Sequence, residues 1–290
     1  MNEYKNFVGS ILEKNLLSFM LSSIDKLHQP KSKTLVFTTP APRSLWNKNK
    51  GPITKVLHIK ALEVARQMTL IDFDLYCKIR PRELCEGAWT KEDRYTTAPN
   101  IMNLVHRFNL VVRWIVTQIV QAKNSSKREA IIAKWIDVAN YFRELNNFNG
   151  VNEVLAAMGS AAVLRLESFK KKENHPVLRE LREMLQPTGN YKAFRKVLKQ
   201  ANPPLVPFVG CFQTDLVFIE DGNKILLPNG HTHFAKCYKV AAVIQQIQQY
   251  QQTPYNLAVV PAIRDFLLNI NPLTEEECWN LSLALKPLGT

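Results

Sequence analysis

Few side chains in this sequence have a type and spacing that could support chemistry. Glu220 and Asp221 are adjacent carboxylates next to Gly222, and on their own they are typical of a solvated helix end. His231 and His233 are the closest pair of histidines. Residues two apart do not share a face of a helix, so we expect no metal site at this pair. These residues alone therefore predict neither a catalytic centre nor a metal centre.

The common motifs that bind nucleotides, metals or acyl groups are absent from the sequence. It contains no G-x-x-x-x-G-K-[ST], G-x-G-x-x-G, H-E-x-x-H or G-x-S-x-G pattern. The cysteines are odd in number, widely spaced and never arranged as C-x-x-C, which is typical of free thiols in a reducing compartment. We therefore expect a protein of the cytoplasm that carries no metal and no cofactor of its own.

The charge balance indicates an anionic partner. Among 290 residues, 38 Lys and Arg outnumber 25 Asp and Glu, which gives a formal net charge of +13. This charge suits nucleic acid, an acidic protein face, or recruitment to an anionic membrane surface. Basic residues are scattered among acidic ones in segments such as 91–94 and 179–183 and do not line one helix, which argues against a nucleic-acid reader. The run Lys170–Lys172 is either a solvated loop or a contact for lipid or phosphate.

The N-terminal part of the chain predicts a helix followed by a linker. An apolar stripe predicts a helix over Tyr4–Leu27, and a Pro-, Ser- and Lys-containing stretch over 29–52 is typical of an extended linker. We therefore divide the chain into residues 1–58 and a domain over 59–290. No apolar run reaches the roughly 18 residues of a membrane span, and the N-terminus lacks the pattern of a secretory signal.

Apolar residues recur at helical spacing through the rest of the chain, which predicts an all-α fold. Ser126–Glu129 and Thr274–Glu277 fit capping boxes at the start of two helices. Asn149-Gly150 is a suitable signal for the end of the first of these. The other predicted helices cover residues 61–79, 103–122, 151–158, 176–185 and 190–200.

The segment after residue 202 predicts a helical hairpin. Prolines at 203, 204 and 207 prevent a regular helix there. Helical spacing resumes over Phe212–Ile219, a turn follows at Pro228–Gly230, and a long helix is predicted over Thr232–Gln251. Two helices joined by a turn make an αα-hairpin over about 212–252.

Several ordered stretches resemble the catalytic domain of Ras-family guanine-nucleotide exchange factors. The resemblance covers about Ala61 to Leu285. The most specific blocks are the opening helix, LEVARQMTLIDF; the segment LNNFNG; and the run PPLVPF with a following TDL. They begin at Leu62, Leu145, Pro203 and Thr214. The family is all-helical, and a protruding helical hairpin opens the nucleotide site of a small GTPase. The resemblance therefore implies a Ras-, Rap- or Ral-type GTPase partner, and an exchange factor that is not an enzyme of covalent chemistry.

The resemblance also assigns roles to individual residues. Val217 matches the apolar position that displaces Mg²⁺ from the GTPase, and Asp221, with Glu220 beside it, matches the acidic position near the phosphate loop. Phe208 and the prolines before it match the support at the base of the hairpin. The positions that match those facing the switch II region of the GTPase are Thr214, Asn190, Leu164, Gly159, Asn152 and Val105.

Departures from the family pattern at Val217, Asp221, Gly159 and Asn190 leave alternatives open. Relatives often have a larger aliphatic residue at the position of Val217 and Glu at the position of Asp221. A non-catalytic scaffold of the same fold that binds a GTPase is therefore the alternative function. Phe208 and the segment 145–150 are either core residues or contacts, and the asparagines of that segment are typical of groups that satisfy backbone at a helix end.

Overall fold

The computed structural model describes residues 37, 39–46 and 53–287, and every regular element in these ranges is a helix. The prediction of an all-α fold is therefore confirmed. The helix predicted over Tyr4–Leu27 lies outside the described residues. The longer helices are α2 (Ala61–Tyr76), α4 (Pro99–Val120), α5 (Ser125–Glu144), α6 (Phe148–Met158), α9 (Pro176–Met184), α10 (Thr188–Gln200), α11 (Gly210–Gly222), α12 (Phe234–Tyr250), α13 (Pro261–Leu268) and α14 (Glu275–Leu285). The short helices are η2 (Val56–His58), η3 (Pro81–Leu84), η4 (Ala88–Thr90), α3 (Arg94–Thr97), α7 (Ala161–Leu164) and α8 (Glu167–Lys170).

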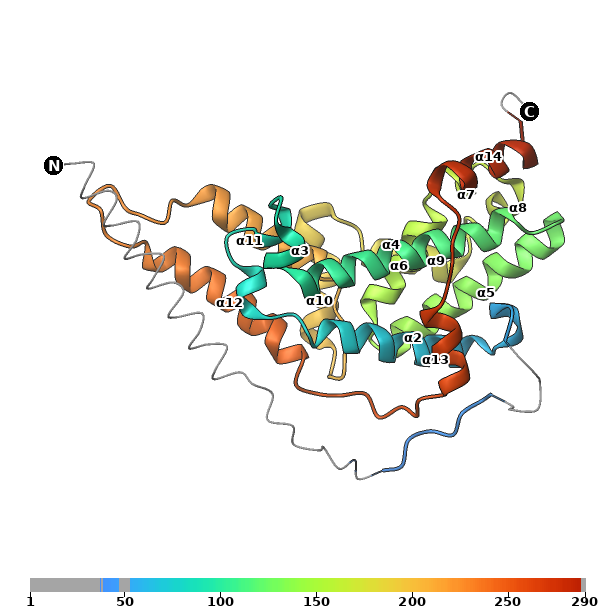
Figure 1. The fold of residues 1–290 in the computed structure, drawn as a ribbon, viewed down its shortest axis with the longest axis horizontal. Helices are drawn as coiled ribbons and strands as arrows, with labels where there is room; N and C mark the ends of the chain where they lie inside the picture. Colours follow the sequence, from blue (N-terminus) through green and yellow to red (C-terminus); the bar gives the residue numbers. More distant parts are fainter. Residues whose placement is uncertain (1–36, 38, 47–52, 288–290) are drawn as a thin grey trace.

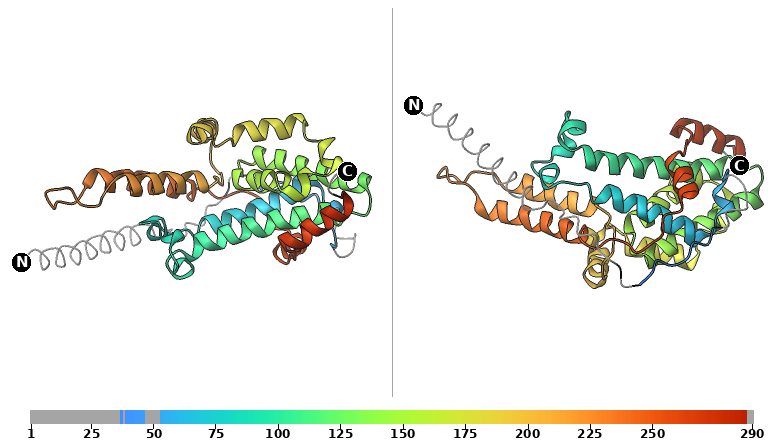
Figure 2. Two further views of the ribbon diagram at one scale, coloured as in Figure 1. Left: turned by 90° about the horizontal axis from the view of Figure 1, so that it is seen from above. Right: turned by 60° about the horizontal axis from the view of Figure 1, so that its bottom comes forward.

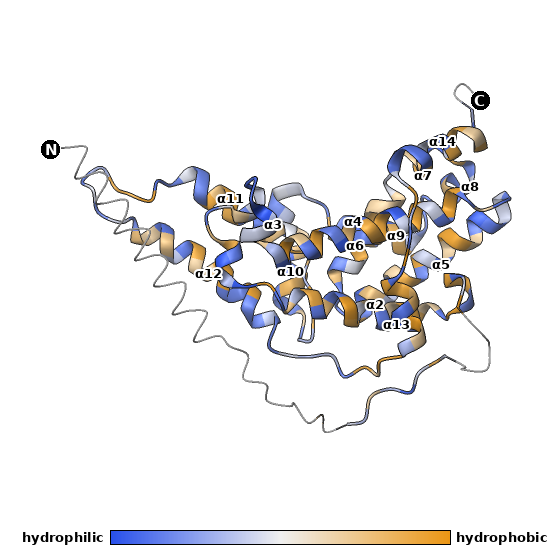
Figure 3. Ribbon diagram, in the orientation of Figure 1, coloured by the Kyte–Doolittle hydropathy of each residue, from blue (hydrophilic) through white to orange (hydrophobic). Residues whose placement is uncertain are grey.

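Helices α2, α4, α5 and α6 pack against one another and form the centre of the core (Figure 1). Their apolar stripes meet there, and Met68, Ile115 and Trp135 are fully buried. The rings of Trp114 and Trp135 join α4 to α5 in an edge-to-face contact with centroids 5.4 Å apart. Figure 3 shows hydrophobic residues on these core helices and also along α11 and α12.

The start of α5 differs from the prediction. Asn124 is the N-cap, and its side-chain oxygen accepts a hydrogen bond from the amide of Lys127 at 2.9 Å. Ser125 instead donates to Glu129 at 3.0 Å. The predicted capping box at Ser126–Glu129 is therefore wrong, because the preceding asparagine already offers a capping oxygen. The capping box at Thr274–Glu277 is confirmed at the start of α14.

The junction of α5 and α6 also corrects the sequence analysis. Helix α5 ends at Glu144, and the dipeptide Asn149-Gly150 lies inside α6 instead of ending a helix. Asn147 caps α6, because its side-chain oxygen accepts from the amide of Gly150 at 2.9 Å. A Cβ atom on Gly150 would lie 2.9 Å from the ring of Phe142 on α5. Close packing of the two helices, and not a helix end, explains this glycine.

Helices α11 and α12 lie side by side and extend away from the core helices (Figure 2). We call these two helices and their connection, residues 210–250, the α11–α12 pair. In the connection, the amide of Leu227 donates to the carbonyl of His231 at 2.8 Å, and Gly230 has a φ of 81° that suits glycine. Among the described helices, none is both long enough and apolar enough to cross a membrane.

Candidate functional site

One face of α11 is exposed and carries apolar side chains beside a carboxylate. Thr214, Val217, Phe218 and Asp221 are spaced by three, four and seven residues from the first, so they share this face. The exposed fraction is 37% for Val217 and 66% for Phe218. Asp221 is exposed, and its carboxylate makes no hydrogen bond or ion pair with any described residue. The face therefore presents an apolar surface that ends in an uncompensated negative charge.

Glu220 has a different environment from the adjacent Asp221. Its Oε2 atom lies 2.5 Å from Nζ of Lys236 on α12, and the side chain of Lys236 is only 8% exposed. Leu216, one turn earlier on α11, is fully buried. Glu220 therefore stabilises the packing of α11 on α12, whereas Asp221 stays free. Because successive residues of a helix point in different directions, these two adjacent carboxylates have different surroundings.

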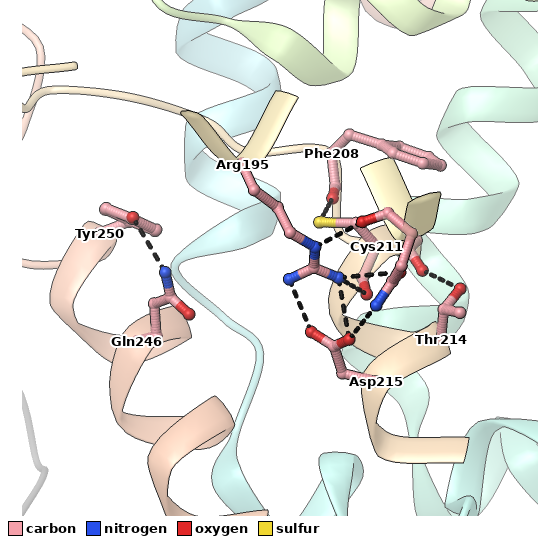
Figure 4. A network of polar contacts seen from close by, with 9 residues as sticks. Arg195, Phe208, Cys211, Thr214, Asp215, Gln246 and Tyr250 are labelled. Carbon is pink, nitrogen blue, oxygen red and sulfur yellow. Dashed lines mark hydrogen bonds and ion pairs between the residues drawn. The ribbon is translucent and has the colours of Figure 1, made fainter. Parts of the chain in front are cut away.

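At the base of α11, a hydrogen-bond network joins this helix to α10 (Figure 4). The guanidinium of Arg195 forms two parallel bonds to the carboxylate of Asp215: Nη1 to Oδ2 and Nη2 to Oδ1, both 2.8 Å. Nη2 also donates to the carbonyl of Cys211 at 3.2 Å, and Nε donates to the carbonyl of Asn190 at 2.7 Å. We call Arg195, Asp215 and Asn190 the Arg195 clamp. Bidentate pairs between arginine and a carboxylate fix the relative orientation of the two side chains as well as their distance.

Asn190 uses both ends of its side chain within the clamp. Its Nδ2 donates to Asp215 at 2.9 Å, and its Oδ1 accepts from Arg195 at 3.0 Å. The backbone of Gly189, Asn190 and Tyr191 is left-handed, with φ between 55° and 61°, so the regular part of α10 begins after Tyr191. The sequence predicted an ordinary helix over 190–200 and did not indicate this turn.

The segment before α11 ties the pair to the core. The carbonyl of Val206 accepts from the amide of Phe148 at 2.8 Å, and the amide of Val206 donates to the carbonyl of Asn146 at 3.0 Å. Phe208 is half-buried, and its ring makes an edge-to-face contact with Tyr191 at 5.7 Å. Phe208 is thus neither a full core residue nor a free contact. Its ring lies against Gly210 at the start of α11.

The other predicted contact residues lie on different helices. Val105 is on α4 and Asn152 is on α6, both half-buried, while Gly159 follows α6 and is exposed. Leu164 ends α7 and is also exposed. Helix α4 packs against both α6 and α7, so the four residues belong to neighbouring elements of the core. No side-chain hydrogen bond among the described residues joins them to the Arg195 clamp.

A polar cluster is buried beneath the start of α6. Asp72 Oδ2 accepts from Asn147 Nδ2 at 2.8 Å, and burial raises the pKa of Asp72 to about 6 although that hydrogen bond and the charge of Arg107 oppose the change. Burial also raises the pKa of Glu153 well above its usual range, and the nearby charge of Asp72 adds to the effect. Since solvent does not reach these groups, the cluster belongs to the core and not to a reaction site.

The remaining groups that could do chemistry have structural roles. Burial raises the pKa of both Cys77 and Cys211 to about 12, so these thiols stay protonated at neutral pH. Cys77, Cys211, Cys237 and Cys278 are free thiols, and no metal-binding group of His, Cys, Asp or Glu occurs in the described residues. In the lysine run, Lys170 pairs with Glu167 at 3.1 Å and Lys171 pairs with Glu129 at 2.8 Å.

Three features of the site were missed by the sequence analysis. Arg195 and Lys236 were not singled out in the sequence, because their partners lie 20 and 16 residues away along the chain. Phe218 stands next to the apolar position at 217, and its exposure follows only from the register of α11. On α12, Phe234 and Tyr238 are also exposed, and their spacing of four residues is the one signal that places them on a common face.

Comparison with known proteins places most of the described structure in one family. The family model of the RasGEF domain matches residues 63–238. The chain is 34% identical over 294 aligned residues to Ras guanine nucleotide exchange factor P of Dictyostelium discoideum. It is 40% identical over 231 residues to Ras guanine nucleotide exchange factor Y of the same organism. It is 37% identical over 250 residues to the protein son of sevenless of Drosophila melanogaster.

These relatives are much longer than the present chain. The three alignments cover 99%, 78% and 81% of this chain but only 19%, 15% and 15% of the respective relatives. The matched segment contains α2 from its third residue onward, the other core helices, the Arg195 clamp, the whole of α11 and the beginning of α12.

Proposed function

The chain belongs to the RasGEF domain family, and we propose that it is a guanine-nucleotide exchange factor for a Ras-like small GTPase of the Ras, Rap or Ral type. The observation that carries the proposal is the exposed face of α11. Apolar side chains and an unpaired carboxylate stand there on a helix pair that extends from the core. Such a surface suits insertion into a protein partner.

The chemistry of the face fits the groups that hold a nucleotide in a GTPase. A GTPase binds GDP through Mg²⁺ and a phosphate-binding loop with a lysine and a hydroxyl group. Val217, extended by the exposed ring of Phe218, brings apolar surface to the Mg²⁺ position, where it offers the metal no ligand. Asp221 accepts hydrogen bonds from the loop groups that lose their phosphate partners. Glu220 does not take this part, because it is bound to Lys236.

The action is a change of equilibrium and needs no covalent step. The factor binds the nucleotide-free GTPase more tightly than the loaded form. By linkage, it weakens nucleotide binding by the same ratio. The excess of GTP over GDP then sets the direction of exchange. The residues of the exposed face therefore act by binding, and the protein requires no cofactor.

A second contact surface comes from the core helices. Leu164 and Gly159 are exposed, and with Val105 and Asn152 they form the part of the core that faces the switch II region of the GTPase. Thr214 contributes its methyl group to the α11 face, since its hydroxyl donates to the carbonyl of Gly210 at 2.9 Å.

We propose that the exchange unit spans residues 59–290 and that the segment before it supports this unit. The amide of Leu45 donates to Glu63 at 2.8 Å, and Val56 is buried in the core. The activity is placed in the cytoplasm, where the net charge of +13 favours recruitment to an anionic membrane.

The test measures the release of a fluorescent GDP analogue from Ras-, Rap-, Ral- and Rho-type GTPases in excess GTP, with and without the full chain. We expect the chain to accelerate release from at least one Ras-like member and to leave release from the Rho type unchanged. Val217→Arg should reduce that release strongly, because a cation cannot approach the Mg²⁺ position without repulsion. Val259→Arg changes a valine that is also exposed but lies before α13, so it is the matched control.

The outcomes separate the functions. Binding of a nucleotide-free GTPase without faster release would indicate the scaffold and contradict the exchange proposal. Equal loss of activity in the two valine variants would show that added charge, and not the α11 face, is responsible.

A further inference from the structure

Helix α10 joins the core to the α11–α12 pair through two adjacent residues. Phe194 is fully buried and packs edge-to-face on Phe148 of α6, with ring centroids 5.3 Å apart. Arg195, the next residue, turns to α11 and binds Asp215. Because consecutive helical residues point about 100° apart, one turn of α10 can hold the core and the projecting pair at once.

Every nitrogen of the Arg195 guanidinium is engaged by this arrangement. Each of its three nitrogens has a partner on Asp215, Asn190 or Cys211 (Figure 4). The side chains of Arg195 and Asp215 are only 26% and 20% exposed, so water competes less for these bonds than on an open surface. Arginine suits this site because its planar fork matches the carboxylate, whereas lysine would offer a single point of attachment.

Few other polar contacts attach the pair to the rest of the molecule. Among the described residues, the clamp supplies the side-chain hydrogen bonds that join α11 to a helix outside the pair. Near the end of α12, which also lies at the base of the pair, Tyr76 donates to the carbonyl of Ile247 at 2.7 Å. Gln251, directly after α12, donates to the carbonyls of Tyr76 and Ile79 at 2.9 and 3.0 Å. The ion pair of Lys236 and Glu220 lies within the pair and moves with it. The direction in which α11 projects is therefore set at its base.

The clamp is separate from the exposed face of α11. Asp215 follows Thr214 around the helix and stands beside the face formed with Val217 and Phe218, where it is held by Arg195. A clamp residue therefore need not touch the partner to affect exchange. The same holds for Asn190, whose side-chain donor and acceptor are both bound within the clamp.

We propose that Arg195 is a positioning residue that holds α11 at the angle needed for insertion, and that Asn190 serves this clamp instead of binding the GTPase directly. This inference rests on the proposed exchange function. A loosened clamp lets α11 adopt other directions, so fewer molecules are ready to insert at any moment.

The test compares Arg195→Met, which removes the charge and keeps the stem, with the milder Arg195→Lys and with Asp215→Asn. At saturating GTPase we expect the maximal exchange rate to fall about 10-fold in Arg195→Met and less in Arg195→Lys. The double variant of Arg195→Met and Asp215→Asn should fall no further than Arg195→Met alone, because both changes remove one interaction. Arg143→Met is the matched control, since it breaks an Arg–Glu pair between α5 and α9.

A second measurement does not depend on activity. Amide hydrogen exchange of the intact protein should become faster in residues 210–222 of Arg195→Met, while α2 and α4–α6 stay protected. Unchanged protection of α11 together with an unchanged maximal rate would overturn the proposal. Loss of protection throughout the chain in both Arg195 variants would also overturn it, because Arg195 would then hold the core. A wild-type protein that activates no GTPase refutes the proposed function, whereas hydrogen exchange still decides whether Arg195 holds α11.

Discussion

Nζ of Lys236 on α12 lies 2.5 Å from Oε2 of Glu220 on α11, and the lysine is almost completely buried. A buried ammonium needs a carboxylate partner, because its transfer from water is costly otherwise. The neighbouring Asp221 carries the same charge but faces solvent. Two acidic residues that look equivalent in the sequence thus have separable roles in stability and in binding.

We predict that Asp221→Asn and Glu220→Gln affect different properties. Asp221→Asn should slow GDP release about 10- to 100-fold, since a charge-assisted hydrogen bond contributes about 1.5–3 kcal/mol. Its free energy of unfolding should change by less than about 0.5 kcal/mol. Glu220→Gln should lower that free energy by about 1–3 kcal/mol, because it leaves Lys236 buried without its counter-charge. Urea unfolding and the GDP-release assay, on the same preparations, measure both properties. Equal stability losses in the two variants would contradict this division.

The sequence predicted most helices because their apolar stripes are long and regular. The stripe from Leu104 to Ile119 identified α4, although the helix begins four residues before the predicted start, at Pro99. Boundaries were harder where two signals compete. Asn124 and Ser126 both offer capping groups to α5, and only the packed structure shows that the asparagine is used.

The site could be predicted only where its residues are close in sequence. The spacing of Val217 and Asp221 places both on one face of a helix. The family resemblance at these two positions was therefore enough to predict that they lie together. The Arg195 clamp joins residues 20 positions apart through a left-handed turn at Asn190. A left-handed turn is signalled in a sequence mainly by glycine, and Asn190 and Tyr191 are not glycines. This part of the site therefore could not be predicted and required the structure.

The buried cluster at Asp72 predicts a pH dependence of stability. Burial raises the pKa of Asp72 from 3.8 to about 6. The folded state therefore binds more protons than the unfolded state between these values, and the free energy of unfolding falls as pH rises through that window. A rise from pH 5 to pH 7.5 should therefore lower the free energy of unfolding by about 1–1.5 kcal/mol through this group. Glu153, whose pKa is also raised, acts in the same direction.

Asp72→Asn tests this prediction, because the amide oxygen can still accept from Asn147. Urea unfolding at pH 5 and pH 7.5 should show a smaller loss of stability in this variant than in the wild type. Asp265→Asn, at an exposed aspartate of α13, should keep the wild-type difference. Identical pH differences in Asp72→Asn and the wild type would show that the carboxyl of Asp72 does not titrate in this range.

The contact of Gly150 with Phe142 predicts a steric effect. A Cβ atom at position 150 would lie 2.9 Å from a fully buried ring, which has no free space to move into. Gly150→Ala should therefore lower the free energy of unfolding by about 1–3 kcal/mol, despite the better helix propensity of alanine. Gly222→Ala is the control, since nothing lies within 4 Å of its added Cβ. Thermal melts compare the two variants, and a Gly150→Ala protein as stable as the control would refute the close packing of α5 and α6.

We predict that truncation of Phe194 and truncation of Phe208, at the base of the α11–α12 pair, differ in their effects on stability and on exchange. Phe194 is fully buried, so Phe194→Ala should cost about 3–5 kcal/mol of unfolding free energy. Phe208 is half-buried against Tyr191, so Phe208→Ala should cost less, about 1–2 kcal/mol. Its ring also covers Gly210 at the first turn of α11, where a Cβ would lie 2.3 Å from the ring. Truncation of this ring should therefore reduce GDP release by more than its stability loss explains. Calorimetry and exchange rates measured well below the melting temperature separate the effects. A Phe208→Ala protein with full exchange activity would show that the ring contributes only to folding.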